Sequence, residues 1–297
     1  MRNKRLLVCD LDNTLYDWVS YFVPSFYAMV DVVVGITGCD REKLLTDFRK
    51  VHQQHGDSEH PFALLETNTI KRLFGGSSIA SMTATLDPAF HAFNSARKKY
   101  LRLHHGVRET LEALERCDVK IIAHTESKLY GVADRLTRLD LFRFFTKVYC
   151  RERSLSSHPE PKSNSEWIKR VPMDKIVELS HHQAKPNPEV LLEICASEGF
   201  SPEQTSYVGD SIARDIFMAK RANVFAIWAA YGAQHDLAMY RDLVRISHWT
   251  ADEVEREQRL KEEAKNIEPD FIARQSFVEV LTALGIDDKL NLIANYR

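Results

Sequence analysis

Short apolar runs recur along the chain, separated by longer stretches in which apolar and polar residues alternate with a helical period. A run of four to seven apolar residues bounded by charge is typical of a strand buried on both faces of a sheet. The runs that we expect to be strands are residues 5–9, 119–125, 147–150, 205–210 and 223–229, with 245–249 as a weaker sixth.

The stretches between these runs predict amphipathic helices. Residues 107–117 and 129–142 each carry an apolar stripe at helical spacing. A third helix should start at Pro188 behind the capping residue Asn187 and end near Gly199. Strands that alternate with helices in this way favour an α/β fold with a parallel sheet covered on both faces. Ligands of such sheets bind at the carboxyl ends of the strands, so the polar residues there are the first candidates for function.

Two segments interrupt the alternation of strands and helices. Residues 17–100 show helical patterns only, which predicts an inserted helical subdomain between the first and second strands. Residues 151–184 begin rich in Pro, Ser and charge and are long for a loop, so they should carry structure or function of their own. Residues 251–265 read as a charged helix with a solvated face, with Glu255–Arg259 and Glu257–Lys261 at supporting spacing.

Composition and charge exclude several classes of function. The 297 residues are 44% hydrophobic and 28% charged with a formal net charge of −2, which favours neither a nucleic acid polymer nor an anionic membrane as partner. The five cysteines are far apart and form no CxxC pair, so we expect neither a disulfide framework nor a zinc site. We find no stretch that approaches a membrane span and no signal peptide, and therefore expect a reduced, cytoplasmic location.

The first apolar run ends on two acids, Asp10 and Asp12. Residues two apart on an extended backbone point to the same face, so the two carboxylates should lie close together and repel. A divalent cation such as Mg²⁺, which prefers hard oxygen ligands, would remove this conflict. The simpler alternative is a strand followed by a turn, because Asp and Asn are common turn residues.

Three further strand-associated sites carry polar residues of complementary kinds. Thr125 offers a hydroxyl for an anionic oxygen, and Lys185, just before a predicted helix, is a point charge suited to phosphate. Asp210 and Asp215 add two acids after the run that ends in Gly209. Each site by itself is equally well explained by a helix cap or a solvated side chain. Taken together, acids, a hydroxyl and a cation at successive strand ends predict a metal-assisted phosphate site.

This set of residues resembles the four motifs of the haloacid dehalogenase superfamily, in its phosphatase branch. The matching segments are DLDNT (10–14), the Thr of IIAHT (125), the Lys of AKPNP (185) and GDSIARD (209–215). The resemblance implies a three-layer Rossmann-like core, residues 1–16 and 101–297, and a helical cap, residues 17–100, that closes over the site. It also implies hydrolysis of a small-molecule phosphate ester, such as a nucleotide monophosphate, a sugar phosphate or phosphoglycolate.

The resemblance further implies a role for each candidate residue. Asp10 is expected to be the nucleophile that forms an aspartyl-phosphate, and Asp12 the acid and base that serves the leaving oxygen and then water. Mg²⁺ would contact the Asp10 carboxylate, the Asp12 backbone carbonyl and Asp210, with Asp215 orienting the waters of the metal. Thr125 and Lys185 would hold the phosphoryl oxygens.

Some features depart from the family pattern or leave alternatives open. Glu126 stands where the family often has Asn, and a carboxylate there would repel phosphate unless it points away or meets a cation. The insertion at 151–184 makes Lys162 and Lys175 competitors of Lys185. The aromatic residues at the start of the predicted cap are expected to pack in the core, with the lining of a substrate pocket as the alternative; they are Trp18, Tyr21, Phe22 and Phe26. Alternative functions are a phosphomutase of the same family and a non-catalytic binding protein that keeps the fold.

Overall fold

The structure is a computed structural model that describes residues 4–60, 62–152, 169 and 171–286. Its centre is a seven-stranded sheet in the order β4-β3-β2-β1-β5-β6-β7, in which every neighbouring pair is parallel. The strands are β1 (Leu6–Cys9), β2 (Lys120–Lys128), β3 (Lys147–Arg151), β4 (Ile176–Leu179), β5 (Thr205–Gly209), β6 (Phe225–Ala229) and β7 (Phe271–Ala273). This arrangement confirms the predicted α/β fold with a Rossmann-like parallel sheet.

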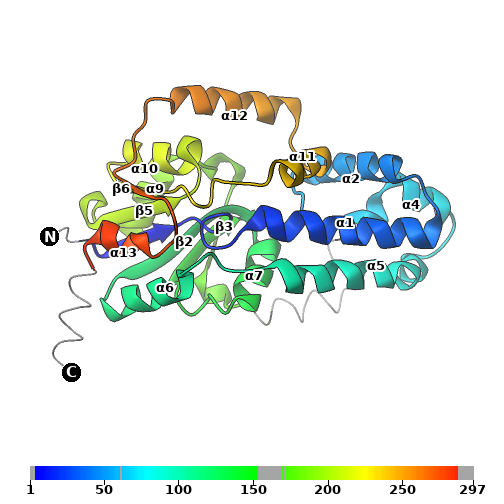
Figure 1. The fold of residues 1–297 in the computed structure, drawn as a ribbon, viewed down its shortest axis with the longest axis horizontal. Coiled ribbons are helices and arrows are strands. Elements are labelled where there is room, and N and C mark those ends of the chain that lie inside the picture. Colours follow the sequence, from blue (N-terminus) through cyan, green and yellow to red (C-terminus); the bar gives the residue numbers. More distant parts are fainter. Residues whose placement is uncertain (1–3, 61, 153–168, 170, 287–297) are drawn as a thin grey trace.

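Helices cover both faces of the sheet (Figure 1). The alternation of side chains along β1 shows which helices pack on each face. Leu7 and Cys9 belong to the apolar cluster that includes α6 (Val107–Arg116), α7 (Leu129–Arg138) and α13 (Glu279–Leu284). Leu6 and Val8 belong to a second cluster with α9 (Pro188–Ser197) and α10 (Phe217–Arg221). All four β1 side chains are buried, which explains why this strand reads as a continuous apolar run.

Five of the six predicted strands are present, and the weaker sixth is wrong. Residues 245–249 form no strand, because Arg245 and Ile246 are the last residues of α11 (Leu237–Ile246). The sheet is completed instead by β4 and β7 at its two edges. An edge strand is less buried than a central one and needs no continuous apolar run, which is why neither edge strand was predicted.

The insertion at 151–184 contributes one of these edge strands. β4 follows a short 3₁₀ turn, Met173–Lys175, and pairs in parallel with β3. A second 3₁₀ turn, His181–Gln183, leads from β4 to Lys185. Residues 153–168 and 170 lie outside the described residues. The insertion therefore carries structure of its own, as expected, and Lys185 follows a fourth strand and not the third.

The segment predicted to be a cap, residues 17–100, keeps that name below. It contains the helices α1 (Trp18–Thr37), α2 (Arg41–His55), α3 (Ala63–Glu66), α4 (Asn68–Leu73) and α5 (Ile79–Tyr100). In Figure 1 these helices lie together beyond one end of the sheet, with α1 and α5 side by side. α11 and the residues after it pack against this group, although we assigned them to the core. His52 on α2 hydrogen-bonds the carbonyl of Ile246, and Gln53 donates to the carbonyl of Trp249 at 3.2 Å. The domain boundaries at 16 and 101 stay a prediction.

The expectation that no stretch approaches a membrane span is wrong for α1. Among the described residues, α1 is the one helix long and apolar enough to cross a membrane by length and composition. Half of its most apolar window is buried inside the protein. Its buried side chains include Phe22, Phe26 and Val30, which pack in the apolar interior of the cap.

The charged helix predicted at 251–265 is α12 (Ala251–Glu263), and it buries none of its residues. The expected pair Glu255–Arg259 forms at 2.8 Å. Glu257, however, accepts from Arg214 at 2.7 Å rather than pairing with Lys261. Helical spacing thus predicted one of the two ion pairs, and a tertiary contact decided the other.

Candidate active site

The carboxyl ends of the strands bring the predicted site residues together. Asp10 follows β1, Thr125 lies in β2 and Asp210 follows β5, while Lys185 enters from the turn after β4. The Asp10 backbone N–H donates to the Val208 carbonyl at 2.9 Å, so the backbone hydrogen bonding between β1 and β5 continues into the site. Residues from four separate stretches of sequence therefore meet at one edge of the sheet.

The turn after Asp10 is tightly fixed. Asn13 adopts a left-handed conformation (φ 60°), and its backbone N–H donates to the Tyr16 carbonyl at 2.8 Å. The Asn13 side chain accepts from the Trp18 N–H at 3.1 Å at the start of α1. Gly232 makes room for this turn, because a Cβ there would lie 1.8 Å from the Asn13 carbonyl oxygen. The segment DLDNT therefore forms a turn, as the simpler alternative proposed, and the same segment also contributes residues to the site.

Four charged side chains form what we call the phosphoryl-side cluster: Asp10, Lys185, Asp210 and Asp215. Lys185 Nζ donates to Asp10 Oδ1 at 2.6 Å and to Asp215 Oδ1 at 2.8 Å. The second Asp10 oxygen, Oδ2, accepts from the Thr14 hydroxyl at 2.9 Å. Lys185 and Asp10 are both buried, at 4% and 7% exposure, so this ion pair acts with little screening by solvent.

The acids of this cluster are strained electrostatically. Burial raises the pKa of Asp10 to about 7 and the Asp215 charge adds to this, although Lys185 opposes the rise. Burial and the charges of Asp10 and Asp215 raise the pKa of Asp210 well above its usual range. Burial alone would lower the pKa of Lys185, but the Asp10 and Asp215 carboxylates raise it well above normal. The lysine therefore stays charged while the carboxylates lack full compensation.

The donor set fits a divalent cation. One oxygen each from Asp10, Asp210 and Asp215 lies within 4.8 Å of the others. Three carboxylates face the single ammonium of Lys185, which leaves an excess of two negative charges. Mg²⁺ carries the matching charge and prefers carboxylate oxygens, and bringing it to this position would relieve the repulsion that raises the pKa values.

The structure also explains how Asp215 is held. Its Oδ1 accepts from the Tyr207 hydroxyl at 3.1 Å, and its Oδ2 accepts from the Ser211 N–H at 3.1 Å. A π-helical turn, Ile212–Ile216, folds Asp215 back over the end of β5. Gly209 is needed there, because a Cβ would lie 2.4 Å from Asp215 Cγ. Asp215 is thereby aimed at Lys185 and the acids.

Glu126, which was expected to repel phosphate unless it pointed away or met a cation, does contact a cation. Glu126 Oε1 accepts from the Lys185 backbone N–H at 3.1 Å, and its Oε2 pairs with Arg151 at 3.4 Å. The carboxylate thus meets a cation and helps to place Lys185. The neighbouring Thr125 is 1% exposed, and its hydroxyl oxygen accepts from the Ser127 N–H at 3.1 Å. Its proton is free of that bond and available for another acceptor.

Lys185, rather than Lys175, reaches the acids. Lys175 Nζ donates to the Phe142 carbonyl at 2.9 Å, at the opposite end of β4 from Lys185. Lys162 lies outside the described residues.

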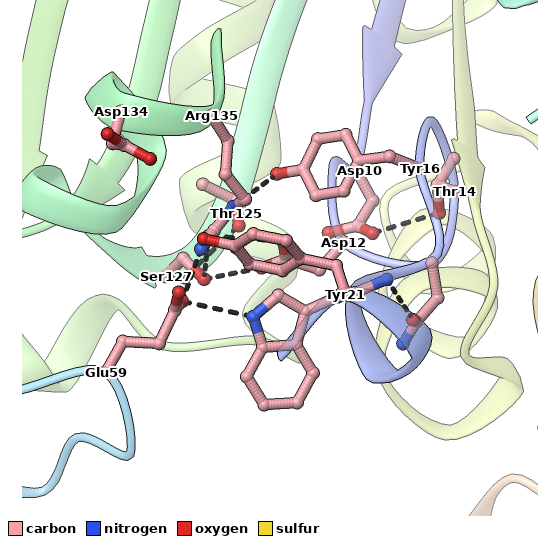
Figure 2. A network of polar contacts seen from close by, with 12 residues as sticks. Asp10, Asp12, Thr14, Tyr16, Tyr21, Glu59, Thr125, Ser127, Asp134 and Arg135 are labelled. Atoms are coloured by element: carbon pink, nitrogen blue, oxygen red, sulfur yellow. Dashed lines mark hydrogen bonds and ion pairs between the residues drawn. The ribbon is translucent and has the colours of Figure 1, made fainter. Parts of the chain in front are cut away.

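A second group of polar residues surrounds Asp12, and we call it the cap-side cluster: Asp12, Ser127, Arg135 and Glu59. Figure 2 shows Arg135 of α7 reaching toward Asp12 and Ser127, with Glu59 approaching from the cap. Ser127 Oγ donates to Asp12 Oδ2, and Arg135 Nη2 lies 3.2 Å from Asp12 Oδ1. The Asp12 carboxylate is thus paired with both a hydroxyl and a guanidinium.

Motif reasoning missed the residues around Asp12 and also Tyr207. Ser127 lies two residues after Thr125 and could have been found by extending that motif along the strand. Arg135 and Glu59 gave no comparable signal, because each is a charged residue in a helical or polar stretch. Only the packing of α7 and the cap against the site brings them to Asp12.

The cap aromatics prove to be both core and cavity lining. Tyr21, Phe22 and Phe26 are buried, at 0 to 2% exposure. Phe22 and Phe26 also line a cavity of about 120 Å³ in the cap, whose wall includes Glu59 and Gly131 next to the cap-side cluster. Trp18 instead donates its indole N–H to Glu59 Oε2 at 3.0 Å.

Another group of possible metal ligands lies in the cap, at His55, His60 and Glu66. The two imidazole Nε2 atoms lie 2.8 and 2.7 Å from the two Glu66 oxygens. The rings are stacked 3.5 Å apart and nearly parallel, so their in-plane lone pairs do not converge on one point. This geometry fits a set of hydrogen bonds that joins the end of α2 to α3 better than it fits a metal centre.

Comparison with known proteins agrees with the geometry of the site. The family model described as haloacid dehalogenase-like hydrolase matches residues 7–177 and 171–229. A glyceraldehyde 3-phosphate phosphatase of Methanopyrus kandleri is 24% identical over 80% of this chain and 89% of its own. Phosphoglycolate phosphatase 1 of Pseudomonas aeruginosa is 26% identical over 79% of this chain and 72% of its own.

A solved structure shows the same fold. The 2-haloacid dehalogenase of Pseudomonas syringae pv. Tomato DC3000 superimposes with a TM-score of 0.53 at 18% identity, covering 95% of this chain and 98% of that one. The predicted enzyme class, a phosphatase of this family, is confirmed by the family match and the phosphatase relatives. The chain belongs to the haloacid dehalogenase-like hydrolases.

Proposed function

We propose that this protein is a Mg²⁺-dependent phosphomonoesterase that hydrolyses a small phosphorylated metabolite through an aspartyl-phosphate on Asp10. The observation that carries the proposal is the phosphoryl-side cluster, in which three acids converge around Lys185 with two uncompensated negative charges. A structural ion pair has no need of such an excess, whereas a site for a dication and a phosphoryl group does.

In the first step Asp10 Oδ attacks phosphorus and the bond between phosphorus and the ester oxygen breaks. Asp12 donates a proton to the departing oxygen, and Lys185 and the Thr125 hydroxyl hold phosphoryl oxygens. Asp10 and Asp210, with the Asp12 carbonyl, would hold Mg²⁺, and Asp215 would orient its waters. When bound, the ion supplies positive charge that offsets the phosphoryl oxygens.

In the second step water attacks the phosphoenzyme. Asp12 takes the proton from that water, the bond between Asp10 and phosphorus breaks, and phosphate leaves. The cap helices would exclude bulk water while the intermediate exists. Asp12 therefore has to reach both the leaving oxygen and the incoming water, which makes its placement important for both steps.

We propose a substrate of the nucleotide monophosphate, sugar phosphate or phosphoglycolate type, present in the cytoplasm. The phosphatases that this chain resembles act, by their names, on glyceraldehyde 3-phosphate and phosphoglycolate, which favours a short phosphorylated carbon chain within that range. The alternatives of a phosphomutase and a binding protein predict transfer without net release of phosphate and no turnover, respectively.

The test is phosphate release from a panel of phosphorylated metabolites and an aryl phosphate, with and without Mg²⁺. We expect one phosphate per ester consumed, lost on chelation of the metal and reduced by about 10⁴-fold or more in Asp10→Asn. The exposed Asp174→Asn variant is the matched control and should keep wild-type rates. Ester consumption without phosphate release would indicate the phosphomutase, and an inactive wild-type protein would contradict the proposed function.

A further inference from the structure

Arg135 is a fully buried cation between the sheet and the cap. Its side chain is 0% exposed, and all three of its nitrogens have partners. Nε donates to the Tyr16 hydroxyl at 2.9 Å, Nη2 donates to Ser127 Oγ at 2.9 Å, and Nη1 pairs with Glu59 Oε2. Burying a guanidinium is costly unless its hydrogen bonds are satisfied, so the position of this side chain is tightly determined.

The Asp12 carboxylate is held through this guanidinium. Arg135 Nη2 lies 3.2 Å from Asp12 Oδ1, and the Ser127 hydroxyl that it orients donates to Asp12 Oδ2. Asp12 itself lies in the turn after β1, where its side chain has no strand or helix to fix it. Arg135 Nη2, at 3.4 Å, and the oriented Ser127 hydroxyl both donate to Asp12 Oδ2, while Oδ1 has no hydrogen-bond partner among the described residues. The carboxylate is thus held through one oxygen and an ion pair, which an isolated loop residue cannot achieve.

The third partner of Arg135 comes from the cap. Glu59 lies between α2 and α3, and its Oε2 also accepts from the Trp18 indole at 3.0 Å. Space for this ion pair is provided by Gly131 on α7. A Cβ at that position would lie 3.0 Å from Arg135 Nη1 and 3.1 Å from Glu59 Oε2. The contact is therefore built from both sides, by a cap acid and by a core helix that leaves room for it.

We propose that Arg135 is a positioning residue that aligns Asp12 for proton transfer, and that Glu59 of the cap holds Arg135 in that alignment. This rests on the proposed function, because it assigns Arg135 a role in the same reaction. The cap thereby acts on the proton-transfer residue through one guanidinium, in addition to covering the site. Ser127 completes the chain of hydrogen bonds from Arg135 to the carboxylate (Figure 2). At the other end of the chain, Trp18 donates to Glu59.

The test uses two phosphate esters that differ in how much their leaving group needs a proton. In the first step an aryl phosphate expels a stabilised phenolate and depends little on Asp12, whereas an alkyl phosphate expels a strongly basic alkoxide and depends on it fully. The single-turnover rate of leaving-group release reports this first step alone, and in Arg135→Met we expect it to fall by about 10²-fold for the alkyl ester and by less than about tenfold for the aryl ester, with KM unchanged. Equal losses on both esters, or a change confined to KM, would overturn the proposal.

Two further variants show whether a lower rate in Arg135→Met comes from misfolding or from misalignment of Asp12. Ser127→Ala removes only a hydroxyl and should show the same difference between the esters, with a smaller loss. Arg138→Met removes another arginine of α7, which pairs with Asp134 at 2.9 Å and is not part of the site; it should change neither ester. If Ser127→Ala lowers both rates equally, Asp12 is not aligned through this network.

The contribution of Glu59 is tested by a double-mutant cycle and by Trp18 itself. Glu59→Gln should slow the alkyl ester selectively, and the Glu59→Gln/Arg135→Met double variant should be no slower than Arg135→Met alone. The fluorescence of Trp18 is identified as the emission that the Trp18→Phe variant loses. Its wavelength should shift in Arg135→Met and not in Arg138→Met. Additive rate losses or an unchanged Trp18 emission would contradict the link to the cap.

These outcomes separate this proposal from the proposed function. A wild-type protein inert toward both esters contradicts the phosphatase activity. An active wild-type protein whose Arg135→Met variant loses both esters equally contradicts only the role of Arg135. The Trp18 emission reports on the Glu59–Arg135 contact without any turnover.

Discussion

The two clusters, one with Asp10 and the other with Asp12, balance their charges in opposite ways. The phosphoryl-side cluster sets three carboxylates against the ammonium of Lys185 and comes from the segments that follow β1, β4 and β5. The cap-side cluster sets Asp12 and Glu59 against the guanidinium of Arg135, which also donates hydrogen bonds to Ser127 and Tyr16. The first is incomplete without a dication, whereas the second is nearly closed by its own side chains.

This difference teaches what each cluster needs in order to work. An excess of buried negative charge attracts a metal cation but destabilises the site without the metal. A satisfied buried network fixes geometry, because each partner restrains the others, and it responds mainly to movement of the cap. Changes in the first cluster should therefore alter metal response, and changes in the second should alter the alignment of Asp12.

The largest contrast should come from Asp12, the acid of the cap-side cluster that follows the proposed nucleophile by two residues. Asp12→Asn should fold normally and lower kcat by about 10²- to 10⁴-fold, because neither the leaving group nor the attacking water exchanges a proton with it. With an aryl phosphate the first step still proceeds, so acid quenching should trap phosphorylated Asp10, in contrast to Asp10→Asn. Wild-type turnover in Asp12→Asn would contradict its role as acid and base.

Acid should loosen the cap side through His52. Burial lowers the pKa of His52 from its usual 6.5 to about 4, opposed by its hydrogen bond to Ile246 and assisted by the neighbouring His248, His60 and His55. Because the folded-state pKa is depressed, its stabilising effect is present above pH 6.5 and is lost as pH falls toward 4. The loss should reach about 3 kcal/mol. Unfolding free energies measured by urea titration between pH 7 and 4 test this.

His52→Gln should remove most of that pH dependence, and the exposed His91→Gln should leave it unchanged. The same acid range should also expose the loop of Glu59, because Ser58 next to it hydrogen-bonds His248 in the segment that His52 holds. Hydrogen exchange at residues 56–60 is the local measurement. Equal pH dependence in wild type and His52→Gln would show that another group dominates.

The smallest effect, of opposite sign, is expected on the phosphoryl side. Asp210→Asn removes one of three repelling carboxylates, so the metal-free protein should gain about 1–2 kcal/mol of stability. It should lose most of the stabilisation that wild type gains from Mg²⁺. Thermal unfolding with Mg²⁺ and with a chelator measures both, with Asp174→Asn as control. A metal-free Asp210→Asn protein less stable than wild type would contradict the excess-charge interpretation.

The strands of the sheet interior were predictable because burial on both faces forces a continuous apolar run, as in Leu6–Cys9. The edge strands β4 and β7 were not predictable, because a half-exposed strand does not need a continuous apolar run. Residues 245–249 were assigned wrongly, because a weak apolar run does not distinguish such a strand from the end of a helix, here α11. Helix signals were more secure: the Asn187 cap and Pro188 placed the start of α9 correctly.

By itself the sequence determined the fold and the residues whose chemistry is tied to strand ends, since Asp10, Thr125, Lys185 and Asp210 occupy positions that a parallel sheet must bring together. Tertiary structure alone decided which other side chains complete the site. Arg135 reaches Asp12 because α7 packs beside β2, and Glu59 reaches Arg135 because the loop between α2 and α3 packs against α7. Spacing along the chain encodes contacts within an element, but contacts between elements depend on how those elements pack.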